Sequence, residues 1–348
     1  MTIDLISCKI RAGRLQRQRE CMRDLYLGID LGGTGIRSAV FNRTGMTMLE
    51  FGDINFKSEP NNKELADSLN PIIKNAIDNC KITAWGLASP GPLDPFKGVI
   101  ETPPNLKVRN FSVVKYFKNL YPSVPGFLIN DADAALLAEY RYGAAQGFNH
   151  VVGVFAGTGL GSAVISNGRL QRGRGKGPEW SHTSIYGFGQ KRQCVCGRTN
   201  CLEIFVGTMG LAQTYCQIFK LDYKTLTREE IFNISIKAHE GLKNKTGDQE
   251  AYKSVLGAYT IHLLEGLKNI TCVHNPDCII LGGGIIKNNP FLIRVLRKLI
   301  ELINDDTKPL FEKLVIKLPK YDNPGTLGAA VYAIDGIDRI RLGGGIIL

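Results

Sequence analysis

The sequence predicts an α/β protein built from two similar halves. Two apolar strands joined by a glycine turn lie near the start of the chain, around Gly32, and the same arrangement returns around Gly157. After each pair, single strands alternate with helices, which is the order typical of α/β architecture. The chain has 348 residues, and at roughly 100–200 residues per domain this length favours two domains.

Hydrophobic periodicity places the elements of the first half. Apolar, β-rich runs bounded by turn residues predict strands. Apolar side chains three or four residues apart, such as Leu65, Leu69 and Ile72, predict a helix. The predicted strands are residues 25–29, 36–41, 47–51, 85–88 and 127–129, and the predicted helices are residues 63–80 and 132–142.

The second half repeats this alternation around one long loop. Thr227 and Glu230 have the spacing of a capping box, so we expect a helix to begin there. Residues 166–203 are rich in Gly, Arg and Cys and lack periodicity, which is typical of a long functional loop. The predicted strands are residues 151–155, 163–165, 278–281 and 314–318, and the other predicted helices are residues 252–273, 292–303 and 326–334.

The composition is that of an ordinary globular protein, with 44% hydrophobic and 22% charged residues. The chain has no apolar run of about 18 residues and no secretory signal at its start, so we expect a cytoplasmic protein without a membrane partner. Much of the net charge of +11 lies in residues 1–24, a predicted basic N-terminal extension, and in residues 169–176 and the basic residues after them, Lys191, Arg192 and Arg198. We interpret this charge as a solvated surface; binding of nucleic acid, of an acidic membrane surface or of phosphorylated ligands is the alternative.

Both glycine turns have the chemistry of phosphate-binding loops. Residues 28–34 (GIDLGGT) and residues 156–161 (AGTGLG) each follow a strand. Glycines let backbone amides approach an anion, and a threonine hydroxyl adds a donor. A hairpin that merely turns is the alternative, but two such turns in one chain favour a triphosphate held at both ends. The candidate residues are Asp30, Gly32, Gly33, Thr34, Gly157, Thr158, Gly159 and Gly161.

A carboxylate stands at the end of a predicted strand, in the pair Asn130-Asp131. A kinase that acts on an alcohol needs a carboxylate within hydrogen-bond reach of the hydroxyl, to orient it and accept its proton. The same pair has the chemistry of a helix N-cap for the helix predicted at 132–142. Both interpretations are open from the residues alone.

A second constellation has the chemistry of a metal site. Cys194, Cys196 and Cys201 are three of the nine cysteines of the chain, and His182 precedes them. Three thiolates and one imidazole complete a tetrahedral set, which is typical of structural Zn²⁺. Free thiols are the alternative interpretation. A local cluster in a chain of this length favours a metal over a disulfide framework.

Taken together in order, these motifs resemble the ROK family (repressor, open reading frame, kinase) of bacterial sugar kinases over roughly residues 25–335. Each motif is modest alone, and their order makes the resemblance specific. The matching pieces are residues 30–34 (DLGGT), 89–94 (SPGPLD), 104–106 (PNL), 130–132 (NDA), 157–161 (GTGLG), Glu179 with His182, residues 194–203 (CVCGRTNCLE) and residues 281–285 (LGGGI).

The resemblance implies a two-lobed actin-like (ribonuclease H-like) ATPase fold with an interdomain cleft. It implies a small α/β lobe of residues 25–130 with a C-terminal helix at about 322–340. The large lobe would be residues 131–321, with a zinc-binding loop at 182–203. It also implies a homo-oligomer, a dimer or a tetramer. Family repressors carry a winged-helix domain ahead of this fold, and residues 1–24 are too few to form one.

By position, the resemblance implies that Asp131 is the catalytic base. His182 would ligate zinc through one ring nitrogen and orient the other toward the sugar. Mg²⁺ is expected with ATP, and Asp30 is the residue expected to reach it, through water. The residues implied in sugar binding are Asn105, Asn130, Asp131, Glu179, His182 and Glu203, and those implied near the adenosine are Gly282, Gly283 and Gly284.

The chain departs from the family pattern near the sugar and zinc loops. Asp133 stands where the family usually has Asn, and Asn200 stands where a glycine is common. Pro178, Trp180 and Ser181 also differ around Glu179 and His182. None of these changes removes a catalytic or metal-binding atom, so they bear on which sugar is bound.

The predicted function is ATP-dependent phosphorylation of a hexose, with the 6-hydroxyl of glucose as the first choice. N-acetylmannosamine, N-acetylglucosamine, fructose and allose are alternatives. Two other classes remain: a sugar-responsive regulator without catalysis, and another ATPase of the same broad fold. The expected cofactors are ATP, Mg²⁺ and structural Zn²⁺. Sugar and ATP are the expected partners, and nucleic acid is not expected.

Overall fold

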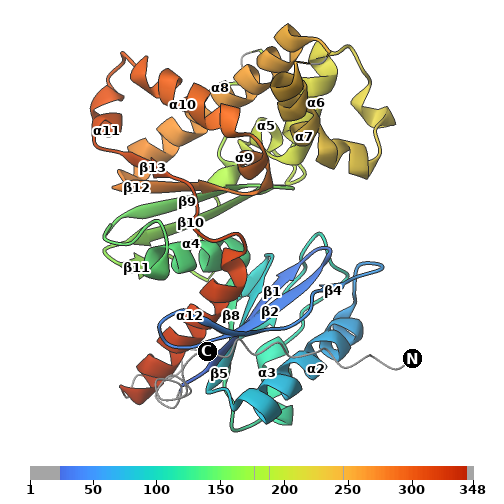
Figure 1. The fold of residues 1–348 in the computed structure, drawn as a ribbon, viewed down its shortest axis with the longest axis vertical. Helices are drawn as coiled ribbons and strands as arrows, with labels where there is room; N and C mark the ends of the chain where they lie inside the picture. The colour runs from blue at the N-terminus through green and yellow to red at the C-terminus, as the bar shows by residue number, and fades with distance from the viewer. Residues whose placement is uncertain (1–23, 176, 188, 246, 343–348) are drawn as a thin grey trace. The chain divides into compact units, whose positions relative to one another are not determined.

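In the computed structural model, residues 24–342 are described, with gaps at 176, 188 and 246 (Figure 1). The predicted basic extension at residues 1–24 therefore lies outside the described residues, apart from Asp24. None of the described helices is long and apolar enough to cross a membrane.

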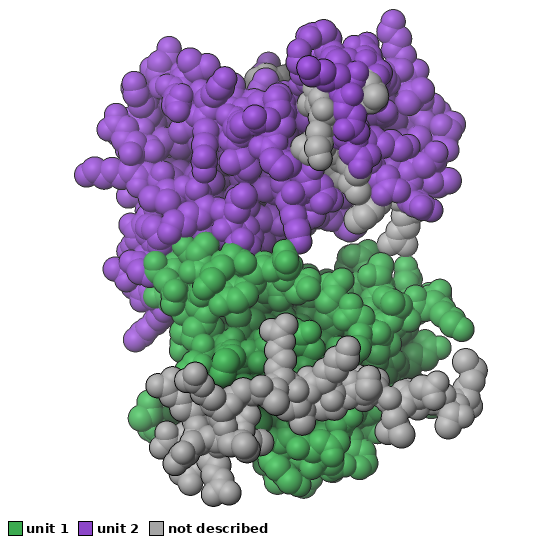
Figure 2. All heavy atoms as spheres, viewed as in Figure 1, with its two compact units in different colours: residues 1–146, 172–177, 320–348 green, residues 147–171, 178–319 purple. Residues whose placement is uncertain are grey.

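The chain divides into two compact units, coloured separately in Figure 2. Unit 1 comprises residues 1–146, 172–177 and 320–348, and unit 2 comprises residues 147–171 and 178–319. This division differs from the predicted lobes, because it places residues 131–146 in unit 1. The physical reason is that helix α4 (Asp131–Tyr142) packs along helix α12 (Pro324–Arg341).

Unit 1 is built on a sheet with strand order β3-β2-β1-β5-β8, with β4 paired to β2. Strand β1 pairs antiparallel with β2 and parallel with β5, which pairs parallel with β8. Because β1 is central and covered on both faces, nearly all its residues are buried. The strands are β1 (Tyr26–Gly32), β2 (Gly35–Phe41), β3 (Thr47–Glu50), β4 (Ile54–Asn55), β5 (Ala84–Ser89) and β8 (Gly126–Asn130).

The two faces of this sheet carry different helices (Figure 1). Leu27, Ile29 and Leu31 of β1 form one core with helices α2 (Asn62–Cys80) and α3 (Val113–Leu120). Since side chains alternate along a strand, Gly28 lies on the opposite face, where α12 packs. A short hairpin of β6 (Leu93–Asp94) and β7 (Val99–Ile100) completes the unit.

Helix α12 approaches the backbone of its neighbours directly. A Cβ at Gly28 would overlap the carbonyl oxygen of Thr326, and a Cβ at Gly86 would overlap that of Ala329. On its other side, a Cβ at Gly328 of α12 would overlap the carbonyl oxygen of Ala134 in α4. Only glycine allows this approach at these positions, because any side chain would separate the backbones.

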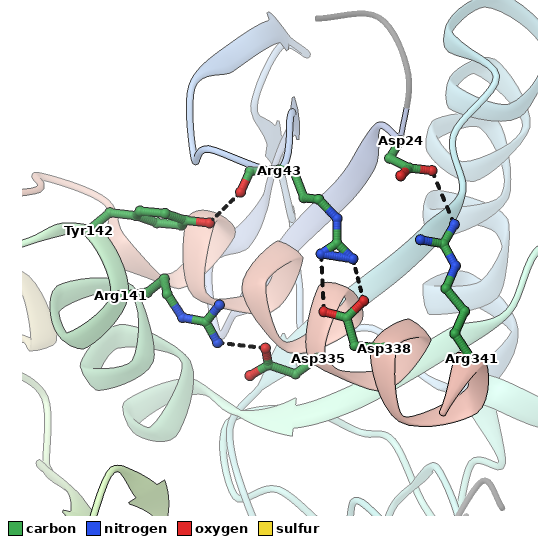
Figure 3. A network of polar contacts seen from close by, with 7 residues as sticks. All are labelled: Asp24, Arg43, Arg141, Tyr142, Asp335, Asp338 and Arg341. Carbon is green, nitrogen blue, oxygen red and sulfur yellow. Dashed lines mark hydrogen bonds and ion pairs between the residues drawn. The ribbon is translucent and has the colours of Figure 1, made fainter. Parts of the chain in front are cut away.

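The far end of α12 carries a network of ion pairs (Figure 3). Asp338 pairs with both terminal nitrogens of Arg43, Asp335 pairs with Arg141 at 2.6 Å, and Arg341 pairs with Asp24 at 3.2 Å. The network links α12 to the segment before β1, to the turn after β2 and to α4. These side chains are partly exposed, so each pair contributes only about 0.2–1 kcal/mol, and the network orients the helix more than it stabilises it.

Unit 2 repeats the topology of unit 1, with strand order β11-β10-β9-β12-β13. In both sheets a glycine turn joins the first two strands as an antiparallel hairpin, and the next two strands add in parallel to the first. This confirms the predicted α/β architecture in two similar halves. The strands are β9 (Val151–Ala156), β10 (Leu160–Ser166), β11 (Arg169–Leu170), β12 (Cys278–Gly282) and β13 (Val315–Lys317).

Helices cover one face of the second sheet and form its core. Leu256, Tyr259 and Leu263 of the long helix α8 are buried with Val152 and Val154 of β9. The capping box predicted at Thr227 and Glu230 is confirmed at the start of α7. The helices are η1 (Trp180–His182), α5 (Glu203–Val206), α6 (Thr208–Ile218), η2 (Tyr223–Thr225), α7 (Arg228–Asn244), α8 (Gln249–His274), α9 (Gly284–Asn288), α10 (Pro290–Glu301) and α11 (Lys308–Glu312).

Replacing Gly328 with Ala tests the close packing of α12. The added methyl group would overlap the backbone of α4, so Gly328→Ala is expected to lower the free energy of unfolding by about 2 kcal/mol or more. Gly257→Ala in α8 is the matched control, because its Cβ meets open space and Ala favours a helix over Gly by about 0.5–1 kcal/mol. Urea denaturation followed by circular dichroism measures both. Equal stability of the two variants would contradict the packing argument.

Candidate functional site

The glycine turn of unit 1 lies against one of the predicted sugar-binding residues. Gly32 and Gly35 are the last paired residues of β1 and β2, so Gly33 and Thr34 form the turn between them. A Cβ at Gly33 would lie only 3.0 Å from the Cβ of Asn105. The fold thus brings together Gly33 and Asn105, which are far apart in the sequence.

Asp30 is held between β2 and the first turn of α12. It faces Arg37 in the strand register, and a Cβ at Gly325 would lie 2.6 Å from its carboxyl carbon. Burial raises the pKa of Asp30, and the charge of Arg37 lowers it in part. The amide end of a helix favours a negative charge, so α12 provides a suitable environment for this carboxylate.

Asn130 and Asp131 have distinct places at the junction of β8 and α4. Asn130 is the N-cap: its Oδ1 accepts from the amides of Ala132 at 2.9 Å and Asp133 at 3.3 Å. Asp131 is the first helical residue, is exposed, and accepts from the Ala132 amide at 2.8 Å. The capping role therefore belongs to Asn130, and the exposed carboxylate of Asp131 lies at the helix N-terminus.

Asp133, one of the departures from the family pattern, is buried in the first turn of α4. A Cβ at Gly177 would lie 3.7 Å from one of its carboxylate oxygens. Gly177 ends a segment of unit 1 whose Arg172 lies over the rings of Phe96 and Tyr332. The segment that precedes Glu179 in the sequence is therefore anchored beside the helix that carries Asp131.

In unit 2, the second glycine turn lies against Glu203. The Leu160 amide donates to Glu203 Oε2 at 3.1 Å, and a Cβ at Gly159 would lie 2.6 Å from the same oxygen. Thr208, at the start of α6, donates from its Oγ1 to the Gly157 carbonyl at 2.7 Å. The first residues of α5 and α6 therefore hold the turn by hydrogen bonds, and one of them, Glu203, is a predicted sugar ligand.

The third glycine run, Gly282 to Gly284, adjoins the same turn. Strands β9 and β12 are parallel neighbours, with Gly282 opposite Phe155. Gly283 has a positive φ of 91°, and a Cβ there would overlap the carbonyl oxygen of Ala156. Two of the predicted nucleotide-binding segments thus lie at the same edge of one sheet, where the carboxyl ends of parallel strands meet.

The predicted sugar ligands of unit 2 interact electrostatically. Burial raises the pKa of Glu179; the charge of His182 lowers it in part, and that of Glu203 raises it further. Glu179 precedes the short helix η1, which ends at His182, and Glu203 begins α5. Residues that are 24 positions apart in sequence are therefore close enough for their charges to interact.

His182 and the three cysteines form a compact set of four ligand atoms. All four atoms lie within 4.8 Å of one another. His182 Nδ1 is 3.7 Å from Cys194 Sγ, and Cys196 Sγ is 3.6 Å from Cys201 Sγ. Zn–S bonds of about 2.3 Å give a tetrahedron with edges of about 3.8 Å, so these residues fit Zn²⁺.

Asn200 has a conformation that explains why it can replace a glycine. Its φ is +57°, in the left-handed region, which Asn tolerates better than most residues. Its Oδ1 accepts from the Arg192 amide at 2.8 Å, and its Nδ2 donates to the Gln190 carbonyl at 3.0 Å. The side chain of Asn200 therefore adds two hydrogen bonds to this loop that a glycine could not form.

Two other residues of this region belong to the core. Trp180 and Ser181 are buried, and Trp180 packs in the main cluster of unit 2. Trp180 was expected to bear on which sugar is bound, whereas its ring faces the core. Its influence on a sugar would therefore pass through the backbone of η1.

Arg192 was predicted to be part of a solvated basic surface, and the structure corrects this. Its guanidinium group is buried over the ring of Phe205 and donates to the carbonyl of Gly210 at 2.9 Å and to Thr214 Oγ1 at 3.0 Å. Burial lowers its pKa to about 10, which leaves it charged at neutral pH. Arg192 ties the loop that contains the three cysteines to α5 and α6. No local pattern in the sequence signals this role.

The duplicated α/β topology, with a glycine turn in each half, defines an actin-like ATPase fold. Within that class, the sequence model of the ROK family matches residues 26–335, and the chain belongs to the ROK family. It is 26% identical to a glucokinase of Thermotoga maritima, over 91% of this chain and 98% of that protein.

Other relatives include both regulators and kinases. The chain is 28% identical to a xylose repressor of Bacillus subtilis, over 78% of this chain and 67% of the repressor. A ROK family glucokinase from Streptomyces griseus, solved in complex with glucose and AMPPNP, matches the fold with a TM-score of 0.72. That match has 23% identity and covers 90% of this chain and 100% of the glucokinase chain.

Replacing Cys196 with Ser tests the metal site. A hydroxyl is a poor ligand for Zn²⁺ compared with a thiolate, so the variant is expected to contain less Zn²⁺ than the wild-type protein. Cys272→Ser is the control, since Cys272 is an exposed cysteine outside the cluster. Elemental analysis of purified proteins measures the zinc content. Full zinc in Cys196→Ser would exclude this residue as a ligand.

Substitutions at Asn200 test the left-handed backbone conformation of this residue. Asn200→Gly is expected to keep zinc but to weaken its retention by about 1 kcal/mol, because two hydrogen bonds are lost. Asn200→Val is expected to cost a further 1–2 kcal/mol or so, because a β-branched residue is strained at positive φ. Zinc release during titration with a chelator measures both. Equal retention by the two variants would contradict the backbone argument.

Proposed function

We propose that this chain transfers the γ-phosphoryl group of ATP to a hydroxyl group of a hexose. One observation carries the proposal: each unit pairs a glycine turn with a side chain suited to bind a hydroxyl group. These pairs are Gly33 with Asn105 in unit 1 and Gly159 with Glu203 in unit 2. A sugar kinase must hold phosphate oxygens and sugar hydroxyls side by side, and the proximity within each pair supports this function.

Asp131 is the proposed general base. Its carboxylate is exposed at the start of α4 and would accept the proton of the sugar hydroxyl as the hydroxyl oxygen bonds to the γ-phosphorus and ADP leaves. Asn130 precedes it, and because its Oδ1 caps the helix, its Nδ2 is the group available to a sugar oxygen. The 6-hydroxyl of glucose is the acceptor we propose first.

Phosphate is the proposed ligand of both glycine turns. Backbone amides in such turns donate to phosphate oxygens and stabilise the charge that develops during transfer. Gly282 to Gly284 would lie near the adenosine. Mg²⁺ supplies charge neutralisation on the phosphate oxygens when it is bound, and Asp30 is the residue we assign to hold it through water. The ATP analogue bound to the Streptomyces griseus glucokinase supports this assignment.

The metal site would orient the sugar-binding loop. His182 has its Nδ1 on the side of Cys194, which leaves Nε2 for a sugar hydroxyl. A metal at the four ligand atoms would fix the ring and hold the segment between His182 and Glu203 in place. Structural Zn²⁺ is thus proposed to act on sugar affinity and not on the transfer step.

Other sugars and one other function remain as alternatives. N-acetylmannosamine, N-acetylglucosamine, fructose and allose differ from glucose in groups that few side chains would have to accommodate. The similarity to a xylose repressor favours a second candidate, a sugar-responsive regulator without catalysis. Cytoplasmic location and a dimeric or tetrameric state stay predictions.

Replacing Asp131 with Asn tests the proposed reaction. The amide keeps the shape of the side chain but cannot accept the proton, so kcat is expected to fall by about 10²-fold or more. A coupled assay of ADP release, with Mg-ATP and a panel of hexoses and N-acetylhexosamines, measures turnover and identifies the sugar. Zinc-replete protein is used throughout.

Asp67→Asn is the control for this assay, because Asp67 is an exposed carboxylate that pairs with Lys63 on α2. Its turnover is expected to equal that of the wild-type protein. Near-normal turnover in Asp131→Asn would remove Asp131 as the base. No turnover of any sugar by folded wild-type protein would favour the regulator, and retention on DNA that weakens with salt would support it.

A further inference from the structure

Glu139 is a buried carboxylate near the end of helix α4, two turns beyond Asp131. Its side chain is 0% exposed. Its Oε2 accepts from the amide of Ala144 at 2.7 Å and from that of Lys320 at 3.0 Å, and its Oε1 accepts from the amide of Tyr321 at 2.9 Å. Burying a charge is costly unless it is hydrogen bonded, and three backbone N–H groups provide these bonds.

The donors to Glu139 come from two segments that are far apart in the sequence. The chain first leaves unit 1 after residue 146 and returns to it for the last time at residue 320. Ala144 lies just before the first of these crossings, and Lys320 and Tyr321 lie just after the second. One carboxylate therefore holds two of the connectors between the units.

Further contacts strengthen this corner of unit 1. The carbonyl of Tyr142 accepts from the Tyr321 hydroxyl at 3.1 Å and from Lys320 Nζ at 3.2 Å. Gly143 provides the necessary room, since a Cβ there would overlap Glu139 Oε2. Lys320 and Tyr321 are thus joined to the end of α4 in two ways. Their amides donate to the Glu139 carboxylate, and their side chains donate to the Tyr142 carbonyl.

We propose that Glu139 is a positioning residue, which fixes both connectors to the helix that carries Asp131. This inference rests on the proposed kinase function. Helix α4 has 12 residues and is a rigid element, so bonds at its end also locate its start. One connector leads to β9 and the second glycine turn, and the other comes from β13. Glu139 therefore fixes the position of both connectors relative to the helix that carries the proposed base.

A positioning role differs from a purely structural one in what its loss affects. General loss of stability would speed amide exchange throughout the protein and lower the amount of active enzyme. Loss of positioning would loosen the three amides and slow the transfer step in a protein that is otherwise folded. A small error in the alignment of Asp131 with the sugar hydroxyl and the γ-phosphate can strongly reduce the rate of transfer. Affinity for the sugar depends instead on the residues that bind its hydroxyl groups.

Glu139→Gln in the full-length chain is the test. The side chain keeps its size, but one acceptor oxygen is replaced by a donor that would face a backbone N–H. Hydrogen exchange of the amides of Ala144, Lys320 and Tyr321 is expected to rise by about tenfold or more, because bonds to a charged acceptor are lost. We expect kcat at saturating glucose and Mg-ATP to fall by about tenfold, with the KM for glucose little changed.

Tyr321→Phe is the matched control at the same corner. It removes the bond from the hydroxyl to Tyr142 but keeps the amide that donates to Glu139. We expect wild-type exchange at Ala144 and Lys320 and wild-type kcat. Glu139→Asp keeps the charge on a shorter side chain. It is expected to give intermediate values, and it serves as the test variant if Glu139→Gln does not fold.

Wild-type exchange at the three amides in Glu139→Gln would overturn the proposal that Glu139 fixes the two connectors. Faster exchange with an unchanged kcat would overturn the positioning role. If the wild-type protein turned over no sugar at all, the proposed function would fail and the positioning role with it. The exchange data would then still decide whether Glu139 holds the connectors.

Discussion

The backbone of helix α12 touches the backbone of two strands and of a second helix, and the rest of unit 1 depends on this contact. Gly28, Gly86 and Gly328 allow it, since a side chain at any of them would overlap a carbonyl group. The contact places the first turn of α12 beside Asp30 and holds α4 along its length. Two proposed functional carboxylates, Asp30 and Asp131, thus derive their positions from one packing arrangement.

Both units use the backbone to satisfy a buried charge. In unit 1, the Glu139 carboxylate accepts three amides. In unit 2, the Arg192 guanidinium group donates to the carbonyl of Gly210 and to Thr214, and it stacks on Phe205. A buried charge that binds main-chain groups ties distant segments together without an ion pair, and each of these charges joins a loop to an element that carries proposed ligands.

The two sheets share one topology but differ in what surrounds the hairpin. In both, the glycine turn joins the first two strands, so the turns occupy equivalent positions in their sheets. In unit 2, a long segment follows the hairpin and carries Glu179, the four metal-ligand candidates and Glu203. The hydrogen bonds of the left-handed Asn200 and of the buried Arg192 hold this segment, which has little regular structure. The repeated topology accounts for the two proposed phosphate-binding turns, whereas the added loop carries most of the proposed sugar ligands of unit 2.

The sequence by itself determined the features that depend on neighbours along the chain. Strands around the glycine turns, the capping box at Thr227 and the compact cysteine cluster were predictable because strand patterning, caps and turns are local. Helix α3 and the two-residue strands were missed because short elements show little periodicity. The tertiary structure alone decided that α4 packs with unit 1 and that Glu139 and Arg192 are buried. These outcomes depend on residues far away in the sequence, such as Lys320 for Glu139 and Gly328 for α4, and no local pattern encodes such contacts.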